Sequence, residues 1–124
     1  MGIFVNYSSN IFPGITSVPT TIVTANTHVI LINSINVCNL GTENIRVNLQ
    51  KLRTQITPVT ITYVNQFEIQ TYSTVDIVAE LGIQIYLQYS ATPSISDSLI
   101  CFSNGYTQKF DCEVTYTILN ELPN

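Results

Sequence analysis

The segment IRVNLQ, residues 45–50, indicates the fold class most directly, because its apolar and polar side chains alternate without a break. In an extended chain Ile45, Val47 and Leu49 share one face, and the polar residues between them share the other. The same period of two recurs in FDCEVTYTI, residues 110–118. Strands with one apolar face are typical of antiparallel sheets, whereas strands of a parallel sheet are buried on both faces. The pattern therefore predicts an antiparallel β protein.

The composition agrees with this prediction. The chain of 124 residues contains 17 Ile, 11 Val and 16 Thr but only 3 Ala. β-Branched residues favour strands and a shortage of Ala disfavours helices, so helical bundles and coiled coils are excluded. Disorder is excluded as well, because apolar residues make up 45% of the chain and charged residues only 10%. The length suits one domain.

Strand patterns recur about every ten residues between turn-forming residues, which is typical of a sandwich. We predict an all-β fold, an antiparallel β-sandwich of jelly-roll or Ig-like type, with eight or nine short strands. Pro58 places the start of its strand at a sheet edge or a bulge. The expected strands cover residues 20–25, 29–38, 45–50, 56–64, 67–71, 75–78, 83–89, 99–102 and 110–118.

Residues 73–82 carry signals for both a strand and a helix. Ser73 with Asp76 resembles a capping box, and Gly82 could end a helix. The β-branched residues between them favour a strand, and a helix this short is marginal. We expect a strand near residues 75–78 and keep a helical turn as the alternative.

The dipeptide Asn104-Gly105 is the strongest turn signal, and it predicts that the last two strands form a hairpin. A hairpin centred there sets Cys101 opposite Gln108, several residues along the ladder from Cys112. We therefore expect the three cysteines, at positions 38, 101 and 112, to be free, buried and reduced, as in a reducing cytoplasm.

Residues 1–14 form an extended N-terminal arm in this interpretation, and residues 15–124 form the single sandwich domain. Ser8-Ser9-Asn10 and Pro13-Gly14 interrupt any long element in the arm. Its apolar side chains are too numerous to stay in water, since burying each large one stabilises by about 1.5–3 kcal/mol. The arm therefore lies on its own domain or on an adjacent subunit.

Charge is scarce. The chain has 4 basic and 8 acidic side chains, a net charge of −4, whereas ordinary globular proteins carry about 25% charged residues. Its surface must consist of neutral polar groups, which suits a subunit packed against neighbours. Because acidic side chains outnumber basic ones, we expect no basic surface that would bind nucleic acid or an anionic membrane. We find no targeting signal and no apolar stretch long enough to span a bilayer.

Motifs for catalysis, a cofactor or a metal are absent from the sequence. His28, the one histidine, is preceded by turn-forming Asn26 and Thr27, so we expect a surface position rather than a catalytic one. Asp97, Asp111 and Glu113 could converge beside the last hairpin, but a solvated acidic edge is the favoured interpretation. We therefore predict no enzyme activity, no cofactor and no metal site.

Two parts of the chain resemble small β-sandwich virion proteins of tailed bacteriophages. Residues 17–50, SVPTTIVTANTHVILINSINVCNLGTENIRVNLQ, resemble the opening of such proteins: a short strand, a long strand ending in an Asn-containing turn, and an alternating strand. Residues 73–78, STVDIV, and 97–119, DSLICFSNGYTQKFDCEVTYTIL, resemble their closing pattern. The resemblance implies a role in head, neck, tail or fibre assembly and supplies no catalytic residues.

Together these observations predict a non-enzymatic virion structural protein, an assembly or decoration subunit of the capsid, neck or tail. It would bind other virion proteins, as a homo-oligomer or in a symmetric assembly, and would occupy the host cytoplasm during assembly. The alternatives are a carbohydrate-binding or adhesin module, with Tyr106 as a contact, and an enzyme depending on His28. The expected protein-interface residues are Ile3, Phe4, Val5, Tyr7, Ile11, Phe12, Asn33, Asn36 and Asn39.

Overall fold

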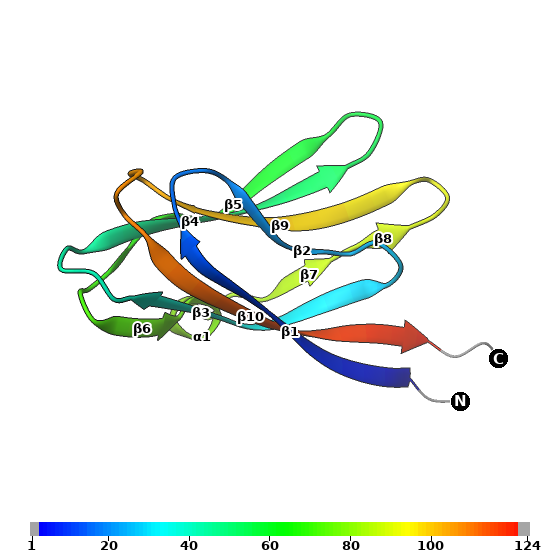
Figure 1. The fold of residues 1–124 in the computed structure, drawn as a ribbon. Coiled ribbons are helices and arrows are strands. Elements are labelled where there is room, and N and C mark those ends of the chain that lie inside the picture. Colours follow the sequence, from blue (N-terminus) through cyan, green and yellow to red (C-terminus); the bar gives the residue numbers. More distant parts are fainter. Residues whose placement is uncertain (1–2, 122–124) are drawn as a thin grey trace.

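The fold is that of a β-sandwich, two antiparallel sheets packed face to face (Figure 1). The structure is a computed structural model that describes residues 3–121, with side chains described for residues 7–119. These residues form ten strands, rather than the eight or nine expected, and one short helix. The all-β class and the sandwich are confirmed, and the first strand, expected as an arm, is one of the additional strands. The elements are β1 (Ile3–Ile15), β2 (Thr20–Thr24), β3 (Val29–Asn39), β4 (Ile45–Thr54), β5 (Val59–Ile69), β6 (Ser73–Asp76), α1 (Ile77–Leu81), β7 (Ile85–Leu87), β8 (Tyr89–Ser90), β9 (Ile95–Ser103) and β10 (Phe110–Glu121).

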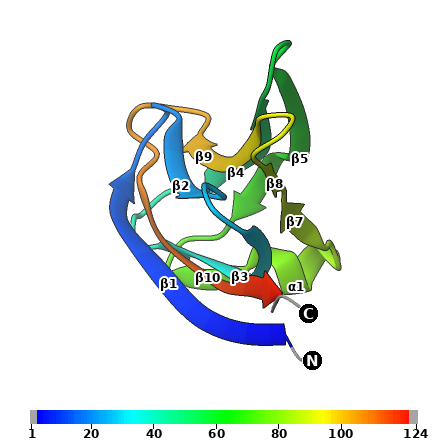
Figure 2. The same cartoon turned by 90° about the vertical axis from the view of Figure 1, so that its right-hand side faces the viewer.

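Each sheet combines early and late strands of the chain. In the first sheet, called sheet A, the order is β1-β10-β3-β6, and β7 also pairs with β3. In the second, sheet B, the order is β2-β9-β4-β5, and β8 pairs with β9. Every pairing is antiparallel. The two layers face each other across the core in Figure 2, and the chain passes repeatedly from one to the other.

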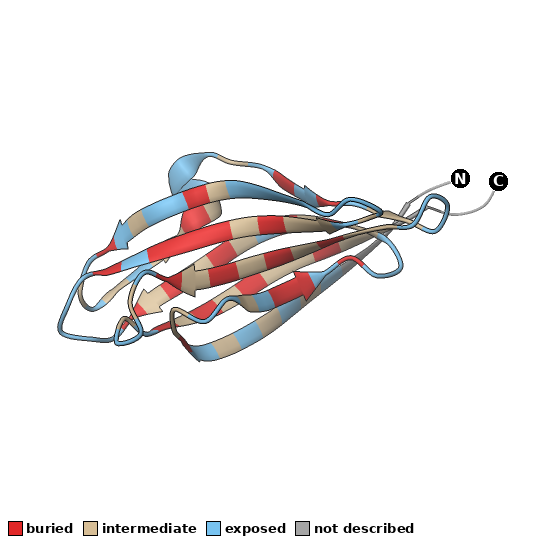
Figure 3. Cartoon of the chain, turned by 90° about the horizontal axis from the view of Figure 1, so that it is seen from above, coloured by how far each residue is buried: buried red, intermediate tan, exposed pale blue. Residues whose placement is uncertain are grey.

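The core lies between the sheets and follows the predicted alternation. Ile45, Val47 and Leu49 of β4 are almost completely buried, whereas Arg46 between them is exposed. Figure 3 shows the same alternation of buried and exposed positions along several strands. Each large side chain removed from water stabilises the fold by about 1.5–3 kcal/mol, so the two apolar inner faces hold the layers together.

The expected N-terminal arm is strand β1, at the edge of sheet A. It pairs antiparallel with β10 over nearly its whole length, from Ile3 opposite Glu121 to Ile15 opposite Phe110. Of the two alternatives, the structure therefore places the segment on its own domain. Phe12 packs against the core and Ile15 is buried, which anchors the strand.

Residues 73–82 form both of the elements that the sequence left open. A strand ends at Asp76, whose Oδ1 accepts hydrogen bonds from the N–H groups of Val78 and Ile35, each at 3.1 Å. The first of these bonds caps α1, and Gly82, with φ 61°, ends it. The expected strand is therefore correct up to Asp76 and wrong for residues 77 and 78, because the cap turns the chain into a helix there.

The predicted closing hairpin is wrong. β9 belongs to sheet B and β10 to sheet A, so the loop around Asn104 crosses between sheets instead of joining two paired strands. Backbone hydrogen bonds from Ser103 N–H to Thr16 O (2.9 Å) and from Asn104 N–H to Arg46 O (3.1 Å) hold the loop on distant parts of the chain. A turn signal does not specify which sheet the next strand joins.

The cysteines are free, as expected. The reason given for Cys101 and Cys112 does not hold, because it placed them at different positions along a β9–β10 hairpin that does not form. Cys101 and Cys112 are both buried and face each other from opposite sheets. Their mutual hydrogen bond, together with burial, raises the pKa of the Cys101 thiol well above its ordinary value. Cys38 is half-buried, so the expectation of burial holds for two of the three.

Candidate functional site

A buried carboxylate lies at one end of the sandwich, where the inner face of sheet B stops being apolar. Asp97 of β9 is completely buried. Its carboxylate accepts two hydrogen bonds from Arg53 of β4, from Nε at 2.8 Å and from Nη2 at 3.0 Å. It accepts a third from the Gln88 N–H at 2.8 Å, and the Lys51 ammonium lies 3.8 Å away. The carboxylate oxygens are thus used by groups of the chain itself.

The surroundings of Asp97 favour its charged form. Burial by itself raises the pKa of a carboxyl group, but the hydrogen bonds from Arg53 and Gln88 and the charges of Arg53 and Lys51 outweigh it, so the pKa of Asp97 is lowered. The same hydrogen bond raises the pKa of Arg53. Lys51 also lies over the Tyr63 ring, 5.6 Å from its centroid. This arrangement stabilises the fold rather than presenting a reactive group.

The expected convergence of acidic residues does not occur. Asp97 is buried in sheet B, whereas Asp111 and Glu113 lie on β10 of sheet A. The Asp111 carboxylate accepts a hydrogen bond from the Gly14 N–H at 2.9 Å. The favoured interpretation, a solvated acidic edge, is also wrong for Asp97, because this residue has no exposed area. Among the described residues no group of three or more His, Cys, Asp and Glu side chains is placed to hold a metal ion.

His28 lies on the surface, in the loop between β2 and β3, as the sequence predicted. Its Nδ1 is 3.1 Å from the Thr27 hydroxyl.

No helix within residues 3–121 has the length and apolarity needed to cross a membrane.

The predicted interface residues of the N-terminal segment are divided between two faces of β1. Tyr7 and Ile11 point outward, with 78% and 68% of their area exposed. Phe12 is half-buried and packs against the core. The side chains of the other three, Ile3, Phe4 and Val5, lie outside the described residues.

The three asparagines of β3 do not share one exposed face. Asn33 is exposed and donates to the Thr117 hydroxyl at 2.8 Å, and Asn36 is half-buried. Asn39 is completely buried, so it does not belong to an exposed strand face. Its amide nitrogen donates to the carbonyls of Glu43, Ile69 and Gln70, and its Oδ1 accepts from the Gly41 N–H. It is a structural residue of the β3–β4 turn, because these bonds use its whole side chain.

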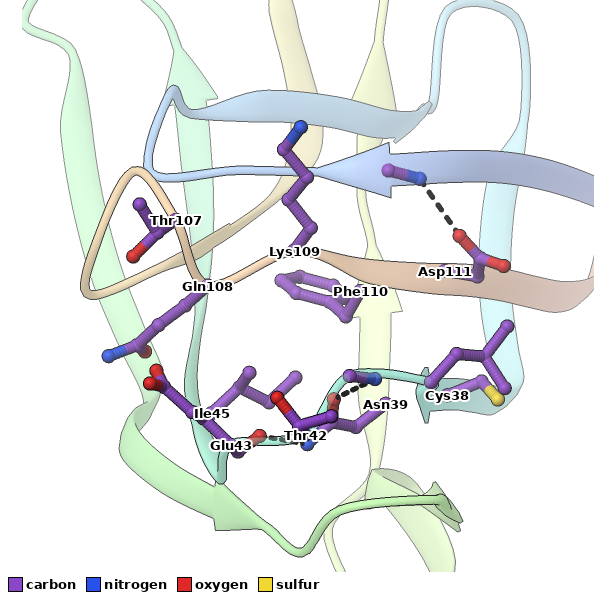
Figure 4. A pocket seen from close by; sticks show the side chains of 13 residues that line it. Cys38, Asn39, Thr42, Glu43, Ile45, Thr107, Gln108, Lys109, Phe110 and Asp111 are labelled. Atoms are coloured by element: carbon purple, nitrogen blue, oxygen red, sulfur yellow. Dashed lines mark hydrogen bonds between the residues drawn. The ribbon is translucent and has the colours of Figure 1, made fainter.

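A cleft of about 660 Å³ with both polar and apolar walls lies at the end of the sandwich opposite Asp97, between the β3–β4 and β9–β10 loops. Figure 4 shows Thr42 and Glu43 on one side and Thr107 and Lys109 on the other. Several other polar groups are already bonded within the chain. The Gln108 Oε1, for example, accepts from the Arg46 N–H at 3.1 Å. The cleft offers the hydroxyl groups of two threonines, the ammonium of Lys109 and the carboxylates of Glu43 and Asp111 to a polar ligand.

The β4–β5 hairpin carries exposed aliphatic side chains that the sequence analysis did not select. It stands away from the rest of the molecule in Figures 1 and 2. Ile56 at its turn is fully exposed, and Val59 and Ile61 of β5 have 42% and 43% of their area exposed. An apolar-walled groove of about 680 Å³ separates the turn from Pro93 and Ser94 of the β8–β9 loop and from Ile95 at the start of β9.

A signal for this hairpin was present in the sequence. Residues 54–67 contain no Asp, Glu, Lys, Arg or His, and in residues 59–62 β-branched side chains occupy both faces. The apolar and hydroxyl side chains alternate there, as in a strand with one buried face, so the missing charge is the part of the pattern that points to a surface for other protein. Pro58 did predict an edge position, and β5 is an edge strand.

Comparison with known proteins adds no family: the chain matches no protein-family model and no curated protein.

Replacing Asp97 by Asn should destabilise the protein by about 3 kcal/mol at neutral pH, because Arg53 and Lys51 lose their buried counter-charge. The figure is at the lower end of the range for buried pairs, since 30% of the Arg53 side chain is exposed. The folded-state pKa of Asp97 is depressed, so its stabilising effect is complete above about pH 4 and is lost as the pH falls through that folded-state pKa. Urea unfolding measured against pH should therefore show the two proteins converging in acid.

The matched control is Glu113→Gln, a charge removal on the half-buried outer side of β10. It should change the free energy of unfolding by less than about 0.5 kcal/mol. Equal losses in the two variants would show that Asp97 holds no special position.

Proposed function

We propose that the protein is a non-enzymatic structural subunit of a bacteriophage virion, which assembles with other protein chains in the capsid, neck or tail. It would bind other protein chains through exposed apolar side chains and open strand edges. It would be assembled in the host cytoplasm and then remain in the virion. The proposal concerns contacts between proteins and requires no reacting group.

One observation carries the proposal, the projecting β4–β5 hairpin with its uncovered aliphatic side chains. Ile56, Val59 and Ile61 expose apolar area on a segment without a charged residue. Exposed apolar patches on soluble proteins mark interaction sites, since water alone would favour their burial. A hairpin that stands clear of the body can reach a neighbour without a change of fold.

Two further features support the same function. Tyr7 and Ile11 on the outer face of β1 give a second exposed apolar surface, far from the hairpin in the chain. The resemblance of residues 17–50, 73–78 and 97–119 to small virion proteins supplies the setting. The scarcity of charge fits a surface that is covered in an assembly, because few charges protect it from association.

Mass spectrometry of virions purified from the phage that encodes the chain tests this function. We expect the chain in a constant ratio to the major capsid protein, since symmetric assemblies contain fixed copy numbers. Its presence in the infected lysate but not in purified particles would contradict the proposal.

The cleft between the β3–β4 and β9–β10 loops favours one alternative, a carbohydrate-binding module. Tyr106 lies in the β9–β10 loop that borders the cleft, and 71% of its area is exposed. An exposed aromatic ring on a loop that also supplies Thr107 and Lys109 to the cleft suits a sugar, whose apolar face packs on a ring while its hydroxyls form hydrogen bonds.

A glycan array probed with the wild type and Tyr106→Ala separates this alternative from the structural function. The alternative predicts a bound glycan whose signal falls at least about tenfold in the variant, because the stacking surface is lost. Tyr72→Ala is the control, since Tyr72 has the same 71% exposure. An array without a bound glycan removes the alternative.

A further inference from the structure

The outer edge of β5 is a sheet edge that the fold leaves open on the projecting β4–β5 hairpin. β5 has 11 residues and pairs with β4 on one side. From Val59 to Thr62 the four residues are exposed and regularly paired with β4, from Arg53 opposite Val59 to Gln50 opposite Thr62. Natural proteins protect such edges with charges, prolines or bulges, because unpaired backbone groups there can bind another strand.

The other sheet edges carry these protections. β1 contains Pro13, and its pairing is irregular between Phe12 and Ile15. β2 has only 5 residues, and the Asn10 side chain of β1 donates to its Ile22 carbonyl at 2.9 Å. β6 and β7, at the far edge of sheet A, have 4 and 3 residues. β1 is nevertheless regularly paired from Ile3 to Phe12, and the pairing of β5 is irregular beyond Thr62. β5 differs from the other edges because it lies on the hairpin that stands away from the rest of the molecule.

We propose that the edge of β5 binds β5 of a second copy of this chain, in an antiparallel pair centred on Ile61. This inference rests on the proposed assembly function, because a subunit of an assembly is present in several copies that can pair. A two-fold axis through Ile61 would place Thr60 opposite the second copy's Thr62, and Val59 opposite its Tyr63. The two copies of sheet B would then form one continuous sheet across the contact.

The sequence of the edge argues for a second copy as the partner. In the proposed register the threonines pair with each other on one face, and the apolar residues Val59, Ile61 and Tyr63 meet on the other. Thr–Thr pairs and pairs of β-branched or aromatic residues stabilise antiparallel strands. The same surface complements itself, which is what a two-fold contact requires.

Charge argues for the same partner. Residues 54–67 have no charged side chain, although the whole chain has a net charge of −4. Two copies can therefore approach through this segment without repelling each other. A strongly basic or acidic partner would find no opposite charge there to pair with.

Sedimentation equilibrium of the full chain over a range of concentrations tests the pairing with four proteins. The wild type should form dimers. Ile61→Lys and Ile61→Glu should each weaken the dimer by roughly tenfold or more, because like charges then lie directly opposite each other. An equimolar mixture of the two variants should form a one-to-one heterodimer. Ile11→Lys, the same substitution on the outer face of the β1 edge strand, should dimerise like the wild type.

Thermal unfolding shows whether each variant is folded, since Ile61 lies opposite Lys51 within the chain. If Ile61→Lys does not fold, Thr60→Glu and Thr62→Lys replace the pair on the outer face. Their mixture should associate more tightly than either alone, because the register sets residue 60 against residue 62.

Three results would overturn the pairing: a wild type that stays monomeric, a mixture that associates no better than its components, or a dimer sensitive to Ile11→Lys and not to Ile61→Lys. None of them decides the virion function, because presence in purified particles is a separate measurement. Conversely, a β5-paired dimer that is absent from virions would leave the pairing standing and remove the virion function.

Discussion

The buried carboxylate of Asp97 holds the point where the chain passes from one sheet to the other. Gln88 lies between β7, which pairs in sheet A, and β8, which pairs in sheet B. Its N–H donates to the Asp97 side chain at 2.8 Å, and its carbonyl accepts from the Asp97 N–H at 3.0 Å. The Asp97 carbonyl accepts from the Ala25 N–H, just after β2, at 2.9 Å. One residue thus joins β9 to the crossover, to the end of β2 and, through Arg53, to β4.

The buried ion pairs of Asp97 with Lys51 and Arg53 also explain why the β4–β5 hairpin is uncovered. Along the inner face of β4, the apolar row of Ile45, Val47 and Leu49 is followed by Lys51 and Arg53. Cations do not pack against a facing sheet, so the apolar core ends where Asp97 neutralises them. The hairpin continues beyond that point without an opposite layer. Its aliphatic side chains remain exposed for this reason and are available to another protein.

Local patterns predicted the fold class well because they depend on neighbouring residues. The alternation in residues 45–50 needs no distant partner to show which face is buried, and Gly82 marks the end of a helix by its own conformation. The closing hairpin was mispredicted because Asn104-Gly105 specifies a turn but not a sheet. The bonds that direct the loop come from Thr16 and Arg46, far away in the sequence.

The sites were less predictable for the same reason. Asp97 and Arg53 are 44 residues apart, and only the sheet register places them opposite each other. Asn39 looked like a surface residue, although its amide is consumed by carbonyls up to 31 residues away. The uncharged residues 54–67 were visible as a pattern, but their exposure depends on where the opposite sheet ends. Lys51 and Arg53 mark the end of the apolar row within β4, but the local sequence does not show that the opposite sheet ends there too.

Amide hydrogen exchange of the wild-type chain, compared at low and high protein concentration, tests most directly whether the uncovered hairpin is the surface that meets other protein. The account predicts that exchange in residues 59–63 slows markedly as the concentration rises, because backbone amides at the β5 edge become bonded to a second strand. Exchange in residues 7–12 of β1 should stay constant over the same range. Unchanged exchange in residues 59–63 at every concentration, or slowing confined to β1, would contradict it.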